Sequence, residues 1–174
     1  MSTLLKNFIS GDHCLSCKGC CRFSAQKSSW APFFTYEEIS DLTRRDLVPS
    51  CLFTHANLSK ECGTQIDLVA QGDRYLCPCF EPASNRCKIY SDRPLDCQLY
   101  PFLLARRGKD IFCALDENCS YIQKVKNTDQ IVRYAQYLIV YFSTQEFWAI
   151  IEKNPGLIQD YGENVAYIKR LSVR

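Results

Sequence analysis

Four cysteines stand within eight residues near the start of the chain, in the run Cys14-Leu-Ser-Cys17-Lys-Gly-Cys20-Cys21. Thiolate sulfur is the donor that zinc and iron–sulfur clusters prefer, and repeated two-residue spacers let one loop wrap around a metal centre. The spacing of the first three cysteines is that of ferredoxin-type clusters, so it favours an iron–sulfur cluster of the 4Fe-4S type. Zinc remains the alternative, because a tetrahedral set of four sulfurs suits it equally.

The last two cysteines of this run are adjacent, which bears on how they could share an ion. Neighbouring side chains point about 100° apart in a helix and to opposite faces in a strand. We therefore expect the sulfurs of Cys20 and Cys21 to diverge. They would then serve two different centres, or one would bind metal while the other packs.

Composition limits the class of protein and its partners. The chain has 174 residues, of which 47% are hydrophobic and 23% charged, as in an ordinary globular protein, and its net charge is +2. So small a charge predicts no nucleic-acid partner and no anionic membrane surface, and no apolar stretch reaches the about 20 residues of a membrane helix. Metal ions are the expected partners, with a protein partner or protein substrate left open.

The expected role of the 12 cysteines depends on whether the cellular compartment is reducing or oxidising. The first ten residues lack the basic start and the unbroken apolar run of a signal peptide, which predicts a cytoplasmic protein. A reducing cytosol favours metal ligation over disulfides, so a secreted disulfide scaffold is the minor alternative.

The elements that must position the cysteines are short. Residues 1–34 suggest a loop, and Thr35 with Glu38 forms a capping box that predicts a helix over 36–47, ended by Pro49. Further on, the pattern predicts three short strands and one short helix. The strands are expected at 66–69, 75–80 and 86–90, the last two forming a hairpin, and the helix begins at 92–94 and carries Cys97.

The last third of the chain is different, since every cysteine precedes residue 120. Apolar residues recur at helical spacing from Thr128 to Lys153, which predicts one long helix with a core-facing aromatic stripe, and a last helix is expected through 165–171. The prediction is a metal-organised α+β fold in a single domain, 1–174, with a cysteine region at about 12–122 and a helical part at about 128–174.

A later phrase carries more cysteines and a resemblance. Cys79-Phe80 is followed by Cys87-Lys-Ile-Tyr90-Ser-Asp-Arg93-Pro94-Leu-Asp-Cys97, then Tyr100-Pro101-Phe102 and a late Cys119. With the first run, this order of motifs over about 12–122 resembles the CxxCxxCC (YkgJ-like) cysteine-cluster family, a zinc- or iron-chelating domain related to flagellin lysine N-methylases.

The resemblance implies eight metal-binding cysteines, here called the family cysteines. They are Cys14, Cys17, Cys20, Cys21, Cys79, Cys87, Cys97 and Cys119. Four more cysteines fall outside the pattern: Cys77 lies beside Cys79 and could replace it, Cys113 is open, and Cys51 and Cys62 are expected to be free or buried thiols.

Residues between the cysteines have mostly structural expectations. Cations at Lys18, Arg22, Arg86, Lys88 and Arg93 could stabilise thiolates, with a structural bond the main expectation for Arg93. Asp92 and Asp96 are expected to cap or to lie at the surface, and His13 to be a loop residue. Tyr90, Tyr100, Trp30, Phe33 and Phe34 are expected to pack around the sulfurs.

Two functions follow from these observations. The first is a metal-binding protein with one or two thiolate-ligated centres, serving electron transfer, metal handling or structure. The alternative is an enzyme that uses the cluster, either a protein-lysine N-methyltransferase, by analogy with the N-methylases, or a redox enzyme. The chain lacks the sequence motifs of Walker A, GxGxxG, GxSxG and HExxH sites.

Overall fold

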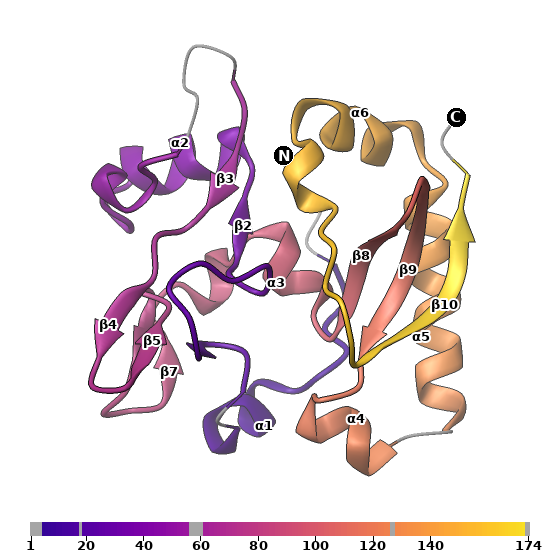
Figure 1. Cartoon of the computed structure of the whole chain (residues 1–174), viewed down its shortest axis with the longest axis horizontal. Helices are drawn as coiled ribbons and strands as arrows, with labels where there is room; N and C mark the ends of the chain where they lie inside the picture. Colours follow the sequence, from indigo (N-terminus) through magenta and orange to yellow (C-terminus); the bar gives the residue numbers. More distant parts are fainter. Residues whose placement is uncertain (1–4, 18, 56–60, 126–127, 173–174) are drawn as a thin grey trace. The chain divides into compact units, whose positions relative to one another are not determined.

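The computed structural model describes residues 5–17, 19–55, 61–125 and 128–172. The chain divides into two compact units, residues 1–98 and residues 99–174 (Figure 1). Short helices and small antiparallel sheets mix along the sequence, which confirms the α+β class. The start of the N-terminal segment, residues 1–4, and Lys18 lie outside the described ranges. That the chain acts as one domain stays a prediction.

The first unit is built from very short elements. A three-stranded antiparallel sheet has the order β1-β5-β4, and two-stranded sheets pair β2 with β3 and β6 with β7. The strands are β1 Arg22–Phe23, β2 Phe33–Phe34, β3 Thr64–Gln65, β4 Val69–Gln71, β5 Arg74–Leu76, β6 Phe80–Glu81 and β7 Arg86–Cys87. The helices are α1 Gly11–Ser16, α2 Tyr36–Arg44 and α3 Leu95–Leu99, with 3-10 turns η1 Ser50–Leu52 and η3 Tyr90–Asp92.

Helix α2 confirms the local prediction made from the capping box. The Thr35 hydroxyl accepts the Glu38 N–H at 3.2 Å, and the Glu38 carboxylate accepts the Thr35 N–H at 2.9 Å. The helix ends at Arg44 rather than near Pro49, because Asp46 adopts a left-handed φ of 56°. Its buried residues, Ile39 and Leu42, join the apolar core of the first unit.

The strand predicted at 66–69 is wrong, although strands lie on either side of it. Ile66 and Leu68 are buried in the core, so their segment is fixed by side-chain packing. Its backbone bonds to loops instead of a ladder, with Ile66 N–H on Pro32 O at 3.0 Å and Asp67 N–H on Leu52 O at 2.8 Å. The alternation of apolar residues in this segment therefore reflects burial of their side chains in the core and not strand pairing.

The predicted hairpin is confirmed at β6 and β7, but the strand predicted over 75–80 is split, since β5 and β6 belong to different sheets and residues 77–79 lie between them. Strands β6 and β7 pair antiparallel with Phe80 opposite Cys87, and residues 82–85 form the turn. Pro78 lies in the turn between β5 and β6, where its missing N–H costs nothing. The short helix after Pro94 is α3, and it carries Cys97 as predicted.

The second unit is a three-stranded antiparallel sheet with helices (Figure 1). Its strands are β8 Phe102–Arg107, β9 Asp110–Asp116 and β10 Val165–Leu171, in the order β10-β9-β8. Its helices are α4 Ser120–Val125, α5 Asp129–Phe142 and α6 Gln145–Lys153, with a 3-10 turn η4 Pro155–Leu157. Helix α5 packs on β10. No helix within the described ranges is both long and apolar enough to cross a bilayer.

Two predictions for this unit need correction. The predicted long helix is confirmed as α5, but it ends at Phe142 instead of continuing to Lys153. The Ser143 and Thr144 hydroxyls bond carbonyls of the last turn of α5, and Thr144 then caps α6. The helix predicted at 165–171 is strand β10, because pairing with β9 outweighs an apolar residue at every third position. The aromatic stripe is core, as predicted, with Phe142 and Trp148 buried.

Candidate metal centre

The first arm of the site is the cysteine run at the end of α1. Cys14 lies within this helix and Cys17 is its C-cap. The Cys17 N–H donates to His13 O at 3.1 Å and to Cys14 O at 3.2 Å, which closes the helix tightly. A helix of six residues thus fixes the first two sulfurs by backbone geometry, although the sequence had suggested a loop here.

Cys20 and Cys21 occupy a tight turn rather than a helix or strand. The Arg22 N–H closes this turn onto Gly19 O at 3.0 Å. The two thiols share a side-chain hydrogen bond, which is the first cause of the strongly raised pKa of Cys20, followed by desolvation. The predicted divergence of the two sulfurs is therefore wrong, because that rule holds only for regular helices and strands.

The second arm consists of residues 77–79 and strand β7. The Cys77 N–H donates to Cys21 O at 3.1 Å, which joins this arm directly to the first. The Phe80 N–H then closes a turn onto Cys77 O at 2.9 Å, and the ladder places Cys87 opposite Phe80. Cys77 and Cys79 are buried in the core of the first unit, and Cys21 and Cys87 pack against it.

Sulfurs from these two arms and from α3 influence one another's ionisation. Burial is the first cause that raises the pKa of Cys14, Cys87 and Cys97, and the Cys20 thiol contributes to each shift. The pKa of Cys87 reaches about 11. Much of residue Cys20 is exposed, but its sulfur lies among these thiols. Cys20 is therefore the point at which the first arm meets the others.

Cys77 and Cys79 complete this group. Their mutual hydrogen bond is the first cause that raises the pKa of Cys77, burial is the second, and the Cys20 thiol adds to it. We call the whole set the thiol cluster. It consists of Cys14, Cys17, Cys20, Cys21, Cys77, Cys79, Cys87 and Cys97. It includes seven family cysteines and one, Cys77, that the family pattern does not contain.

Two buried polar groups belong to the surroundings of these sulfurs. The Tyr90 hydroxyl and Arg93 Nε are buried, and neither has a hydrogen-bond partner among the described residues. Burial raises the pKa of Cys14 overall, but the Arg93 charge and the neighbouring Tyr90 hydroxyl both act to lower it. The Arg93 guanidinium lies 4.3 Å from the centre of the Tyr90 ring and also opposes the raised pKa of Cys87. Donors and cations so placed favour thiolate over thiol.

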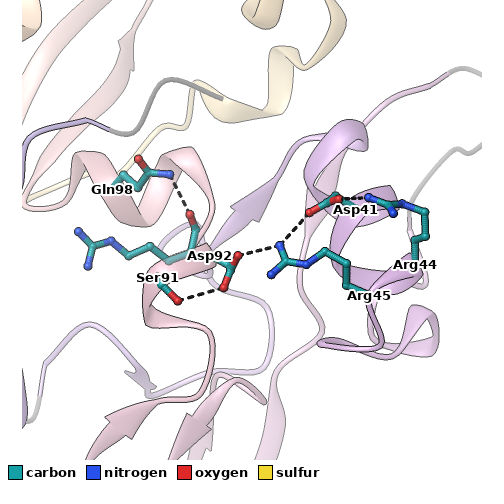
Figure 2. Close-up of polar contacts among 7 residues, drawn as sticks. Asp41, Arg44, Arg45, Ser91, Asp92 and Gln98 are labelled. Atoms are coloured by element: carbon teal, nitrogen blue, oxygen red, sulfur yellow. Dashed lines mark hydrogen bonds and ion pairs between the residues drawn. The ribbon is translucent and has the colours of Figure 1, made fainter. Parts of the chain in front are cut away.

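Ion pairs anchor the chain between Cys87 and Cys97 to α2. Figure 2 shows Arg45 between two carboxylates, at 3.0 Å from Asp41 Oδ2 and 2.7 Å from Asp92 Oδ1. Hydrogen bonds from Arg45 first, and from Ser91 second, hold the pKa of Asp92 below its ordinary value. Because these groups are largely solvated, the pairs position this segment more than they stabilise it. Asp92 is thus structural, as predicted.

Asp96 differs from the surface role expected for it. Its carboxylate accepts the Phe33 N–H at 2.9 Å, and burial raises its pKa to about 7. It also contributes to the raised pKa of its neighbour Cys97, after burial. Asp96 is therefore a half-buried residue whose carboxylate links α3 to β2, next to a family cysteine.

Cys119 is the family cysteine that lies in the second unit. It is buried, and burial raises its pKa, while N–H groups of Ile122 and Tyr121 oppose the shift by bonding the sulfur. Cys113, on β9, is also buried, and burial alone raises its pKa to about 12. Outside the pattern, Cys51 is exposed and Cys62 is half-buried, and that neither binds metal stays a prediction.

The donor chemistry fits a thiolate-ligated metal. No cysteine in the described ranges forms a disulfide, and the thiol is the form from which metal ligands are made. Backbone N–H groups of Cys79 and Ile89 bond the sulfurs of Cys77 and Cys87, as they do around metal-bound thiolates. In the described parts of the chain, no three His, Cys, Asp or Glu side chains already stand at the spacing of a bound ion. The structure thus gathers the sulfurs without setting their coordination.

Thiols gathered from several short elements, with cationic and N–H donors around them, define a class: the metal-chelating cysteine-cluster proteins. Comparison with known families agrees. Residues 13–120 match the CxxCxxCC family model, described as "Putative zinc- or iron-chelating domain", and the chain belongs to this family. No curated protein and no solved structure gives a match. The relation to flagellin lysine N-methylases stays a prediction.

One residue at this site was not anticipated from the sequence. Asn85 lies in the β6–β7 turn and bonds the backbone of the first arm. The turn-rich residues 81–85 did predict a turn, but nothing in a turn sequence names its partner 71 residues away.

Proposed function

We propose that the thiol cluster, with Cys119, holds one or two thiolate-ligated metal centres, and that an iron–sulfur cluster is favoured over zinc. The centre serves electron transfer, metal handling or the stability of the fold. The family assignment supports chelation of zinc or iron. The choice of iron–sulfur rests on the ferredoxin-like spacing of the first three cysteines and on the nearly all-sulfur donor set.

The single observation that carries the proposal is the convergence of the thiols. Sulfurs from α1, the following turn, residues 77–79, β7 and α3 affect one another's ionisation. These segments are up to 83 positions apart, since the cluster runs from Cys14 to Cys97. Eight neutral thiols packed together stabilise the fold little more than small apolar residues would. Eight sulfur donors in one place are, by contrast, what a metal centre requires.

Each part of the chain has a role in holding such a centre. The eight family cysteines would supply the thiolates, and an iron–sulfur cluster, when bound, supplies one-electron redox chemistry. Arg93 offsets negative charge on the sulfurs, and the neighbouring Tyr90 hydroxyl acts to lower the pKa of Cys14. The aromatic and aliphatic core beneath Cys77 and Cys79 excludes water from one side.

Cys77 competes with Cys79 for a place in the ligand set. Both are buried, and their thiols are hydrogen-bonded to each other. Only one of two such neighbours is needed to complete a four-sulfur centre, and the family pattern favours Cys79. Comparing Cys77→Ser with Cys79→Ser for bound metal decides between them: loss of metal in the second variant alone supports the family set.

The test of the proposal is metal and sulfide analysis of protein purified without oxygen. We expect a brown protein that contains iron and inorganic sulfide and absorbs in the visible range. A colourless protein with stoichiometric zinc would contradict the iron–sulfur assignment and keep the chelating role. Protein without either metal would contradict the proposal as a whole.

Matched variants show whether the metal belongs to the thiol cluster. Cys87→Ser and Cys97→Ser should lose most of the bound metal. Cys51→Ser removes an exposed thiol outside the cluster and should keep it all. Equal loss in all three variants would show that the metal is bound adventitiously.

A further inference from the structure

Asn85 occupies a backbone position that few residues tolerate. It ends the turn between β6 and β7 with a φ of 53°, in the left-handed region, where asparagine is one of the few side chains accepted besides glycine. Its residue type thus has a local explanation. The bonds made by its side chain need a second explanation.

The side-chain amide of Asn85 lies at the C-terminal end of α1. Nδ2 is 3.3 Å from Cys14 O and 3.0 Å from Cys17 O, and it also donates to Leu15 O. The last carbonyls of a helix have no partner within it, and they form the negative end of its dipole. A distant hairpin therefore supplies a further donor to this end of the helix, in addition to the Cys17 N–H.

Arg22 fixes which way the amide points. Its Nη2 donates to Asn85 Oδ1 at 2.9 Å, and a guanidinium can only donate, so the NH₂ group must face the carbonyls of α1. The guanidinium also lies 4.4 Å from the centre of the Phe80 ring. Phe80 in turn pairs with Cys87 across the hairpin. A chain of contacts thus runs from the β6–β7 ladder to the backbone of Cys14 and Cys17.

We propose that Asn85 is a positioning residue for the metal centre, whose amide holds the C-terminal end of α1, with Cys14 and Cys17, in register with the Cys87 thiol of the β6–β7 hairpin. The inference rests on the proposed metal-binding function and deepens it. Asn85 touches no metal itself. It fixes the carbonyls beside two family cysteines, and it stands two residues before a third, Cys87. Without the amide, the first arm keeps its thiols but loses the bond that sets their distance from the second arm.

The test compares Asn85→Gly with Asn164→Gly in the full-length chain. Glycine accepts the positive φ at both positions, so only the side-chain amide is lost. Asn164 is the matched control, an exposed turn residue with a φ of 65° that lies before β10 in the second unit. Zinc, as the probe, is loaded into each protein, and its transfer to a coloured chelator gives the affinity and the release rate.

We expect Asn85→Gly to bind zinc about ten- to a hundred-fold more weakly, the range seen when groups that orient metal ligands are removed. Asn164→Gly should match the wild type. The metal-free forms of both variants should keep wild-type far-ultraviolet circular dichroism. A second variant, Asn85→Asp, keeps the size and turn preference but turns a carboxylate toward carbonyls, and it should also weaken binding.

Each outcome of this experiment either supports or overturns the inference about Asn85. Wild-type zinc affinity in both Asn85 variants would overturn the inference. Metal-free Asn85→Gly that has lost its secondary structure would also overturn it, since Asn85 would then have a general structural role. If the wild type itself fails to bind zinc or iron, the proposed function fails, and the inference fails with it. A wild type that binds metal, with unaffected Asn85 variants, overturns the inference alone.

Discussion

Metal affinity should depend steeply on pH, because burial raises the pKa of thiols that would bind the metal, among them Cys87 and Cys97. The Cys87 thiol has a pKa of about 11, raised first by burial and then by neighbouring thiols. One pKa unit corresponds to about 1.4 kcal/mol, so removing this proton at pH 7 costs about 5 kcal/mol. A bound metal must supply that energy for each such ligand, and it releases one proton per thiol.

The sign and the slope follow directly. Raising the pH makes each proton easier to remove, so affinity increases by about tenfold per pH unit for every ligand thiol that stays below its pKa. A four-thiolate centre should therefore gain about four powers of ten between pH 6.5 and 7.5. For the metal-free protein the effect is opposite: a thiol with a raised pKa stabilises the fold below its ordinary pKa of 9.0, and this is lost as the pH rises through about 11.

The assay is competition for zinc with a chelator of known pH dependence, with proton release measured by calorimetry in buffers of different ionisation enthalpy. Cys51→Ser should show the wild-type slope, whereas Cys87→Ser should bind too little zinc to release a comparable number of protons. A change of tenfold or less per pH unit would mean that at most one proton leaves, and would refute a centre built from several buried thiols.

Three further perturbations test the surroundings of the cluster and the packing of each unit. Tyr90→Phe removes the hydroxyl that neighbours Cys14 and should weaken zinc binding by about tenfold in the same competition assay, with unchanged circular dichroism; wild-type affinity would count against the hydroxyl. Glu38→Gln leaves one of two bonded backbone N–H groups facing a donor and should lower the free energy of unfolding by about 1–3 kcal/mol in denaturant titrations. Burial raises the pKa of Glu38 above 4.5, so this loss should be largest at low pH and shrink as the pH rises through the raised pKa; a loss that grows with pH would contradict the assignment. Phe142→Ala empties a site that is 2% exposed and 4.8 Å from the Phe147 ring, and should cost about 3–5 kcal/mol by the same titration; a cost under about 1 kcal/mol would show that the second unit is loosely packed.

The sequence predicted an element correctly where neighbouring residues alone determine its structure. Thr35 and Glu38 predicted a helix start because the capping box is completed within four residues. The turn-rich stretch before Cys87 predicted the hairpin for the same reason. Strand β10 was not predictable in this way, since it depends on pairing with β9, about 50 residues earlier in the chain.

The candidate site likewise has features that the sequence predicted and features that it did not. The cysteines could be identified from the sequence as candidate metal ligands, because their residue type and spacing already limit the chemistry they can perform. The turn at Cys20 and Cys21 was misjudged, because a rule for regular elements was applied to a turn. Asn85 could not be identified from the sequence, because its bonds to the backbone carbonyls of Cys14 and Cys17 are apparent only in the folded structure.

Metal-dependent protection of individual cysteines tests the central claim most directly. The metal-loaded and metal-free proteins are alkylated under identical conditions, and each cysteine is quantified by mass spectrometry. We predict that metal protects the family cysteines of the thiol cluster, whereas Cys51 reacts in both states and Cys113 resists in both because it is buried. Protection that is absent, or that is the same for Cys51 as for Cys87 and Cys97, would contradict a metal centre built from these sulfurs.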